Sequence, residues 1–194
     1  MMSFKNKKLY FLIIALLLII SAVCFFNTKY SSASNQEIIN LIRQAETMIQ
    51  RITIPPSEYI GNIKDLPESA KKQMLEQNLK DIDNLFGGNA HSSMINVVNY
   101  HFSRPISRNC VDGGVSKINI IRLNYTETGA EVTADVYKYL VHRENRNGQL
   151  VDVRLDGKGT YIYTLEKTAD GWKITNIDGG PDLDSSRTRI IPVK

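Results

Sequence analysis

The chain has 194 residues, of which 42% are hydrophobic and 23% are charged, and its formal net charge is +4. This length suits a single domain with a sizeable core, preceded by a short N-terminal segment. Lys5, Lys7 and Lys8 crowd into the N-terminal head, so the rest of the chain is close to electrical balance. A nucleic-acid-binding protein carries a concentrated basic face, and the sequence beyond the head has none.

An unbroken run from Leu9 to Phe26 carries no charge and is mostly apolar. A helix of this length spans about 27 Å, close to the ~30 Å hydrocarbon core of a bilayer. Lysines precede the run, and only Lys29 follows it before Glu37, so the positive-inside rule keeps the N-terminus in the cytoplasm. We therefore expect residues 1–30 to be a cytoplasmic head and a transmembrane signal anchor of a single-pass cell-membrane protein.

Two alternatives stay open for this segment. Ser31 and Ser32 lead into Ala33, where small residues suit cleavage, and cleavage there would give a secreted protein. Lipidation of Cys24 would make a lipoprotein, although Val23 is bulky where that motif favours a small residue. In all three cases the remaining chain lies outside the cytoplasm.

The two cysteines also bear on the compartment. Cys24 lies in the apolar run and Cys110 is alone beyond it, so no disulfide can form within the outer part of the chain. An extracytoplasmic protein without disulfides fits a bacterial surface protein better than a small eukaryotic secreted domain. We interpret Cys110 as structural rather than reactive.

Residues 31–64 are predicted to form a tether, an amphipathic helix and a loop. Ser34 can cap the helix, and Glu37 completes a capping box. Apolar residues at three- and four-residue spacing predict a helix over about 35–52. They are Ile38, Ile39, Leu41, Ile42, Ala45, Met48, Ile49 and Ile52. Pro55 and Pro56 end it.

A second helix is expected to start with Asp65 as its cap and to carry Pro67 and Glu68 in its first turn. Gly87 and the glycine after it stop this helix. Residues 91–103 fit either a short helix or a strand, since β-branched and aromatic residues are mixed with helical spacing.

Beyond Pro105 the apolar period changes to two, which predicts four strands. These are Ser116–Tyr125, Glu131–Arg143, Leu150–Thr168 and Trp172–Ile177. Glycine-containing turns join them, as in hairpins. The glycines around Lys158 predict a bulge that curves the sheet. Residues 179–194 are expected to be a flexible tail.

Helices followed by an antiparallel meander predict an α+β domain over residues 65–178. The closing pattern YIYTLEK at 161–167, followed by Gly-Trp-Lys-Ile at 171–174, resembles the last hairpin of the nuclear transport factor 2-like, cystatin-like superfamily. The resemblance covers about residues 66–177. It implies helices packed on a curved antiparallel sheet, the cystatin-like cone, with a pocket between them. The superfamily includes enzymes, binding domains and membrane-tethered parts of bacterial secretion and conjugation machinery.

Strand alternation indicates where chemistry could lie. In the second predicted strand, Asp135, Tyr137 and Tyr139 share the face opposite the apolar one. A desolvated Asp135 beside Tyr137 could act as a general base with a phenol donor, although an exposed aspartate on a wet face is commoner. Tyr161 and Tyr163 share a face of the next strand and are expected to stack on Tyr137 and Tyr139. These five residues are the pocket or surface candidates.

No catalytic, metal or cofactor motif is recognised. The three histidines, His91, His101 and His142, lack metal-ligand spacing, and no nucleophile elbow, phosphate loop or dinucleotide fingerprint occurs. We therefore assign no catalytic residue, no metal and no cofactor.

The sequence favours a membrane-anchored extracytoplasmic domain that binds a protein partner or assembles a surface complex without catalysis. The alternative is a small-ligand binder or a small pocket enzyme of the same superfamily. A third hypothesis is self-association through the helix over 35–52 or through a face of the sheet.

Overall fold

A computed structural model describes residues 34–60, 66–104, 106 and 109–192, with side chains up to Gly180. Leu9 to Phe26, Cys24 and Ala33 lie outside these residues. No helix in the described part of the chain is both long and apolar enough to cross a membrane. The chain divides into two compact units, Met1–Ile39 and Asn40–Lys194, and the second is described below.

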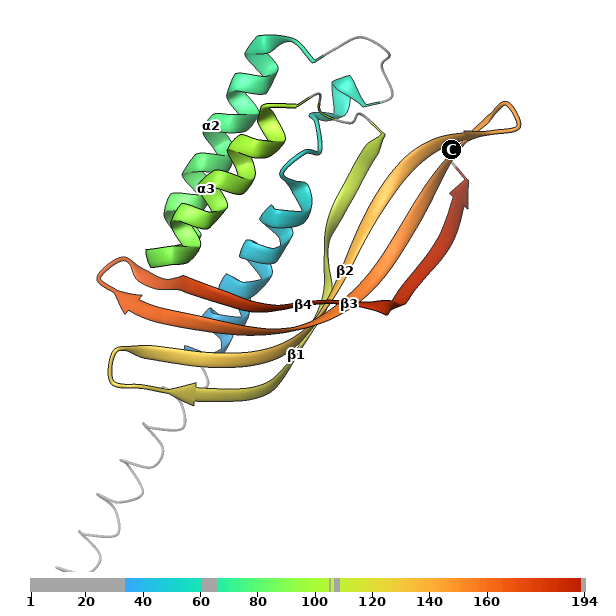
Figure 1. Ribbon diagram of the computed structural model, residues 1–194. Coiled ribbons are helices and arrows are strands. Elements are labelled where there is room, and N and C mark those ends of the chain that lie inside the picture. Colours follow the sequence, from blue (N-terminus) through green and yellow to red (C-terminus); the bar gives the residue numbers. More distant parts are fainter. Residues whose placement is uncertain (1–33, 61–65, 105, 107–108, 193–194) are drawn as a thin grey trace, which may run out of the picture. The chain divides into compact units, whose positions relative to one another are not determined.

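The structure is α+β, as expected, with helices first and then a four-stranded antiparallel sheet in the order β1-β2-β3-β4 (Figure 1). An unlabelled helix occupies residues 34–51, and its residues from Asn40 onward belong to the second unit. The other elements are the 3-10 turn η1 (Ser57–Tyr59), α2 (Glu68–Leu85), α3 (Gly88–Phe102), β1 (Cys110–Tyr125), β2 (Gly129–Arg146), β3 (Gln149–Thr168) and β4 (Gly171–Pro192).

The helix over 34–51 matches its predicted bounds to within one residue. Its buried side chains in the second unit recur at the predicted spacing and are Leu41, Ile42, Ala45, Glu46 and Met48. Four of these five are apolar, which is typical of a helix packed against a core. Glu46 is the exception, a charged residue on the buried face of the helix.

The second helix begins later than the sequence suggested. Pro67 occupies the N-cap position and Glu68 is the first helical residue of α2, while Asp65 lies outside the described residues. The ambiguous segment 91–103 is helical, as part of α3. A two-residue link at Phe86 and Gly87 joins the helices, and the Gly87 N–H donates to the Ile174 carbonyl at 2.9 Å.

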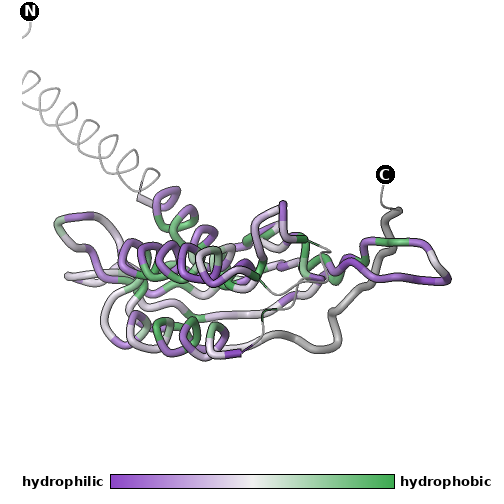
Figure 2. The backbone as a smooth tube through the Cα atoms, turned by 90° about the horizontal axis from the view of Figure 1, so that it is seen from above, coloured by the Kyte–Doolittle hydropathy of each residue, from purple (hydrophilic) through white to green (hydrophobic). Residues whose placement is uncertain are grey.

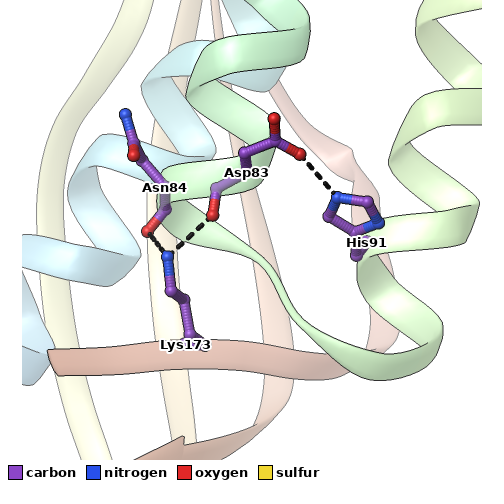
Figure 3. Close-up of polar contacts among 4 residues, drawn as sticks. All are labelled: Asp83, Asn84, His91 and Lys173. Carbon is purple, nitrogen blue, oxygen red and sulfur yellow. Dashed lines mark hydrogen bonds and ion pairs between the residues drawn. The ribbon is translucent and has the colours of Figure 1, made fainter. Parts of the chain in front are cut away.

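The α2–α3 link is fixed to the sheet by side-chain contacts too (Figure 3). Lys173 Nζ donates to the carbonyl oxygens of Asp83 at 2.7 Å and Asn84 at 2.6 Å. A cation at these otherwise free carbonyls compensates the negative end of the α2 dipole. His91 Nε2 lies 2.8 Å from Asp83 Oδ1, which ties α3 to the same end of α2.

The core lies on the sheet face that carries the predicted apolar residues. Val132, Ala134 and Val136 of β2 are fully buried, and Tyr161 and Tyr163 of β3 share their face. Figure 2 shows hydrophobic and hydrophilic residues alternating along the helices, as expected where one helix face is buried and the other is wet.

The sheet is strongly curved (Figure 1), and its bulges contribute to that curvature. The pairing of β3 with β4 shifts register between Asp156 and Lys158, at the predicted glycine bulge. Three further shifts interrupt the pairing of β1 with β2.

Residues 179–192 correct the sequence prediction, because they continue β4 instead of forming a tail. Thr160 pairs with Gly180, and Val151 pairs with Pro192 at the far end. Two glycines and a proline at 179–181 hide the two-residue period, which is why the sequence predicted an end there. Gly179 has φ 105°, a conformation that side-chain-bearing residues rarely adopt.

This part of β4 gives a testable prediction. Gly179→Ala should lower the free energy of unfolding by about 1–2 kcal/mol, because of the positive φ and because a methyl group would press on the Thr160 carbonyl. Gly180→Ala is the matched control, since a methyl group there meets nothing within 4 Å. Urea unfolding measures both. Equal stability of the two variants would mean that residues 179–192 are a tail after all.

Candidate functional site

The space between the 40–51 stretch of the first helix and the sheet contains an ion pair. Glu46, only 1% exposed, accepts a hydrogen bond at Oε1 from the Tyr163 hydroxyl at 2.7 Å. The Lys138 ammonium forms an ion pair with Glu46 Oε2. Helix and sheet are therefore joined by a charge-assisted contact in the middle of the core.

Tyr161 completes this cluster. Lys138 Nζ donates to Tyr161 Oη at 3.0 Å and lies 4.1 Å from the centre of its ring. The ring lies over Gly159, where a Cβ atom would stand 2.5 Å from its Cε2. Because Gly159 has no side chain, the Tyr161 ring can lie above it and contact Lys138.

In this cluster the positive charge of Lys138 compensates the negative charge of Glu46. Burial, and then the negative charge of Glu46, raise the pKa of Tyr163, so its phenol stays protonated and donates. Because the Glu46 carboxylate contacts both Tyr163 and Lys138 of the sheet, the cluster orients the helix on the sheet.

A groove opens on the surface between the 40–51 stretch of the helix, residues 54–60 and α2. Its volume is about 1000 Å³. The apolar part of its lining consists of Met48, Ile54, Pro55, Pro56, Ile60, Met74, Leu85 and Val111. Gln44, Gln73 and Gln77 add amides to the walls. The lining of the groove combines apolar side chains with a few polar ones, which is the usual composition of a binding site.

The charged residues of the groove are mainly cationic. Arg43 and Arg51 line it from the helix. Arg51 is half-exposed and lies 3.8 Å from Asp112, a weak surface contact. Asp81 is the acid in the lining, and it already accepts from Gln77 at 2.8 Å. The groove therefore favours a ligand that brings negative charge.

The sequence-predicted acid lies elsewhere, on the sheet face away from the helices. Asp135 accepts from Thr160 Oγ1 at 2.7 Å and pairs with Lys158 Nζ at 2.8 Å. Hydrogen bonds from Lys158 and then Thr160 lower the pKa of Asp135. A general base of this kind needs a raised pKa, so this carboxylate is not tuned for that role.

This salt bridge predicts a pH dependence. A lowered pKa means that Asp135 stabilises the fold above the ordinary aspartate range and that this contribution disappears as the pH falls through its folded-state pKa. Asp135→Asn should therefore lose stability at neutral pH and flatten the acid side of the stability profile. Urea unfolding at a series of pH values tests this, and parallel profiles for the two proteins would contradict it.

The candidate tyrosines form two separate groups. Tyr161 and Tyr163 pair with Ala134 and Val132, so they face the core. Tyr137 and Tyr139 belong to the opposite face of β2. The expected stacking between the two groups is wrong, because the pairing register places them on opposite sides of the sheet.

Tyr139 and Tyr137 interact with charged neighbours instead. Tyr139 Oη donates to Asp112 Oδ2 at 3.2 Å, and the Arg154 guanidinium lies 3.9 Å from its ring centre. Burial, and then Asp112, raise the pKa of Tyr139. Tyr137 has the ammonium of Lys117 at 5.7 Å from its ring centre. These contacts connect side chains of β1, β2 and β3 on the sheet face away from the helices.

Cys110 is buried, and its Sγ lies 3.4 Å from His142 Nδ1. Burial raises the pKa of the Cys110 thiol, which disfavours the reactive thiolate. Among the residues that the structure describes, no three His, Cys, Asp or Glu side chains gather closely enough to hold a metal ion.

The sequence interpretation missed Glu46, although a signal was present. Glu46 lies four residues after Ile42 and eight after Ile38, on the apolar stripe of its helix. Lys138 likewise interrupts the apolar face of β2. Opposite charges that interrupt two apolar faces are the signature of a buried pair, because each charge needs a partner.

Fold and groove together define an α+β domain with a groove on its surface. No protein-family model matches the chain, and a search of curated proteins finds no match. Among solved structures, the intermembrane space region of chloroplast protein ARC6 is similar at 12% identity and a TM-score of 0.47. That match covers 72% of this chain and 91% of the other.

Proposed function

We propose that this protein is a membrane-anchored extracytoplasmic domain that binds another protein and does not catalyse a reaction. One observation carries the proposal. Buried side chains, the Glu46–Lys138 pair among them, lie between the helices and the sheet, whereas the groove beside the helix is open to solvent. Binding then takes place at the surface, where a macromolecule has access.

The sequence supports the location. The run from Leu9 to Phe26 has the length and polarity of a signal anchor, and Asn27 to Ala33 leave a tether of only seven residues. The described helices and curved sheet are compatible with the proposed cystatin-like membership. A domain on so short a tether would meet its partners close to the membrane surface.

The alternative hypothesis of a pocket enzyme receives less support. It requires an acid inside an enclosed pocket. Asp135 and Glu131 lie on the sheet face away from the helices, and Glu46 is neutralised by Lys138. A small-ligand binder would have to use the same surface groove.

Location can be tested directly with the full chain in a bacterial host. We expect the protein to remain in the membrane after alkaline carbonate extraction. We also expect a C-terminal tag to be digested by protease added outside spheroplasts, while an N-terminal tag is protected. Release of a shortened chain into the medium would instead support cleavage near Ala33, and protection of the C-terminal tag would contradict the proposal.

Binding can be tested in the same cells with a photocrosslinking amino acid. We expect position 44, at the groove, to give a discrete adduct with another protein. Position 93, on the exposed side of α3, is the matched control and should give none. Absence of an adduct at position 44, or equal adducts at both positions, would contradict a groove-based binding function.

A further inference from the structure

The groove between the helix and α2 has features that specify its ligand, an inference that rests on the binding function proposed above. We propose that it binds an extended peptide segment of a partner protein, and that two carboxylates of this segment pair with Arg43 and Arg51.

The volume and the lining residues of the groove are compatible with a peptide chain. A volume of about 1000 Å³ is at the upper end of the ~300–1,000 Å³ range of small-molecule pockets. Met48 and Met74 lie in the lining, and thioether side chains adapt to irregular apolar partners. Pro55 and Pro56 line the same groove and stiffen the segment that borders it.

The side-chain amides of Gln44 and Gln73 are available to bind a peptide backbone. Gln44 and Gln73 line the groove, are exposed, and form no hydrogen bond to another described residue. Each offers a donor and an acceptor, which is what an extended peptide unit requires. Gln77 and Asn78 are instead occupied by Asp81 and by the Ile52 and Met74 carbonyls. The free amides come from both walls, one on the helix and one on α2.

The arginines set the chemistry of the bound side chains. Arg43 and Arg51 are eight residues apart on one helix, which separates their backbone positions by about 12 Å along the axis. Among the described residues, Arg43 makes only a long 3.4 Å contact to the Val115 carbonyl, and Arg51 makes only the 3.8 Å contact to Asp112. Most of their donors therefore remain available to a carboxylate.

The same spacing predicts a pattern in the ligand. An extended peptide rises about 3.3 Å per residue, and alternate side chains point the same way. Residues four apart are then about 13 Å from each other on one side of the strand, close to the arginine separation. The preferred segment carries two acidic residues four positions apart, with apolar residues between them.

Fluorescence anisotropy of fluorescein-labelled ten-residue peptides tests this with the full chain in detergent micelles. One peptide has glutamates at its fourth and eighth positions in an apolar and serine frame. A second has glutamines there, and a third of identical composition has the two glutamates adjacent. We expect the first peptide to bind about tenfold more tightly than the second, the factor that two exposed ion pairs can supply together.

Charge variants make the test specific. The double variant Arg43→Gln/Arg51→Gln should bind the first two peptides with equal affinity, while its affinity for the glutamine peptide stays unchanged. Arg146→Gln, on the β2–β3 hairpin away from the groove, is the matched control and should keep the full preference. Thermal unfolding of each variant checks that the fold is retained.

Several results would overturn the inference. They are equal binding of the glutamate and glutamine peptides, preference for adjacent glutamates, or no binding of any peptide. An adduct from position 44 to the same chain or to a second copy would identify another occupant and would also overturn it. If a heterologous adduct forms in cells but the peptides show no charge preference, the binding function stands and the carboxylate chemistry fails.

Discussion

Replacing Glu46 with alanine is expected to lower the free energy of unfolding by about 3 kcal/mol. The change would leave the Lys138 ammonium without its partner and the Tyr163 hydroxyl without its acceptor. Breaking a buried ion pair from one side costs about 3–5 kcal/mol. We expect the lower end because Lys138 is still 16% exposed and can recruit some water. Urea unfolding with an unchanged m-value is the measurement.

A double variant separates the contribution of the Glu46–Lys138 pair to stability from that of the neighbouring residues. Glu46→Leu together with Lys138→Met removes both charges and keeps the volume, so most of the lost stability should return. Tyr163→Phe alone should cost about 1–2 kcal/mol, because it removes one hydrogen bond to a charged group. If Glu46→Ala were as stable as the parent protein, the carboxylate could not be buried as described.

Gly159→Ala is expected to cost about 2–3 kcal/mol. The added methyl group would stand 2.5 Å from Cε2 and 2.7 Å from Oη of Tyr161, so the ring must move. Overpacking of a well-filled core typically costs about 1–3 kcal/mol. The displaced ring would also lose its contacts with Lys138. Urea unfolding gives the cost, and the near-ultraviolet circular dichroism of the tyrosines should change.

Gly157→Ala is the matched control for this variant. It lies two residues away in the same strand, and a methyl group there meets nothing within 4 Å. Its stability should stay within about 0.5 kcal/mol of the parent protein. Similar losses for both variants would point to backbone requirements of the bulge, and the role of Gly159 as space for Tyr161 would be refuted.

The periodic parts of the fold could be predicted from the sequence. The apolar stripe of the 34–51 helix and the alternation in β2 both report which face is buried, and the structure agrees at Ile42, Ala45, Val132 and Val136. Local patterns of this kind are dictated by the helical and strand periods themselves.

Segments whose structure depends on distant neighbours could not be predicted. Residues 91–103 carry both helical spacing and β-branched residues, and the short link at Phe86 and Gly87, fixed to β4, favours a helix there. Gly180 and Pro181 look like the start of a tail, yet they pair with Thr160 and Gly159 because β3 extends beside them.

In the candidate site, too, local patterns predict some features and contacts between distant residues determine the others. Asp135 and Tyr137 could be assigned correctly to one strand face, but the partners of Asp135 come from the next strand. The groove joins residues from the helix, from 54–60 and from α2, whose packing no local pattern reveals. The sequence shows Glu46 as a charged residue on an apolar stripe. Its role as the buried partner of Lys138 is seen only in the structure.

The irregularities of β1 have a consequence for the behaviour of the protein at high concentration. As an outer strand of the sheet, β1 presents backbone donors and acceptors that another chain could extend into a fibril. Its register shifts near Asp112, Lys117 and Arg122 break that row into short pieces. On the other side, the Phe86 bridge occupies the β4 edge at Ile174. The bulged edge of β1 and the bridged position of β4 are therefore poor templates for edge-to-edge polymerisation.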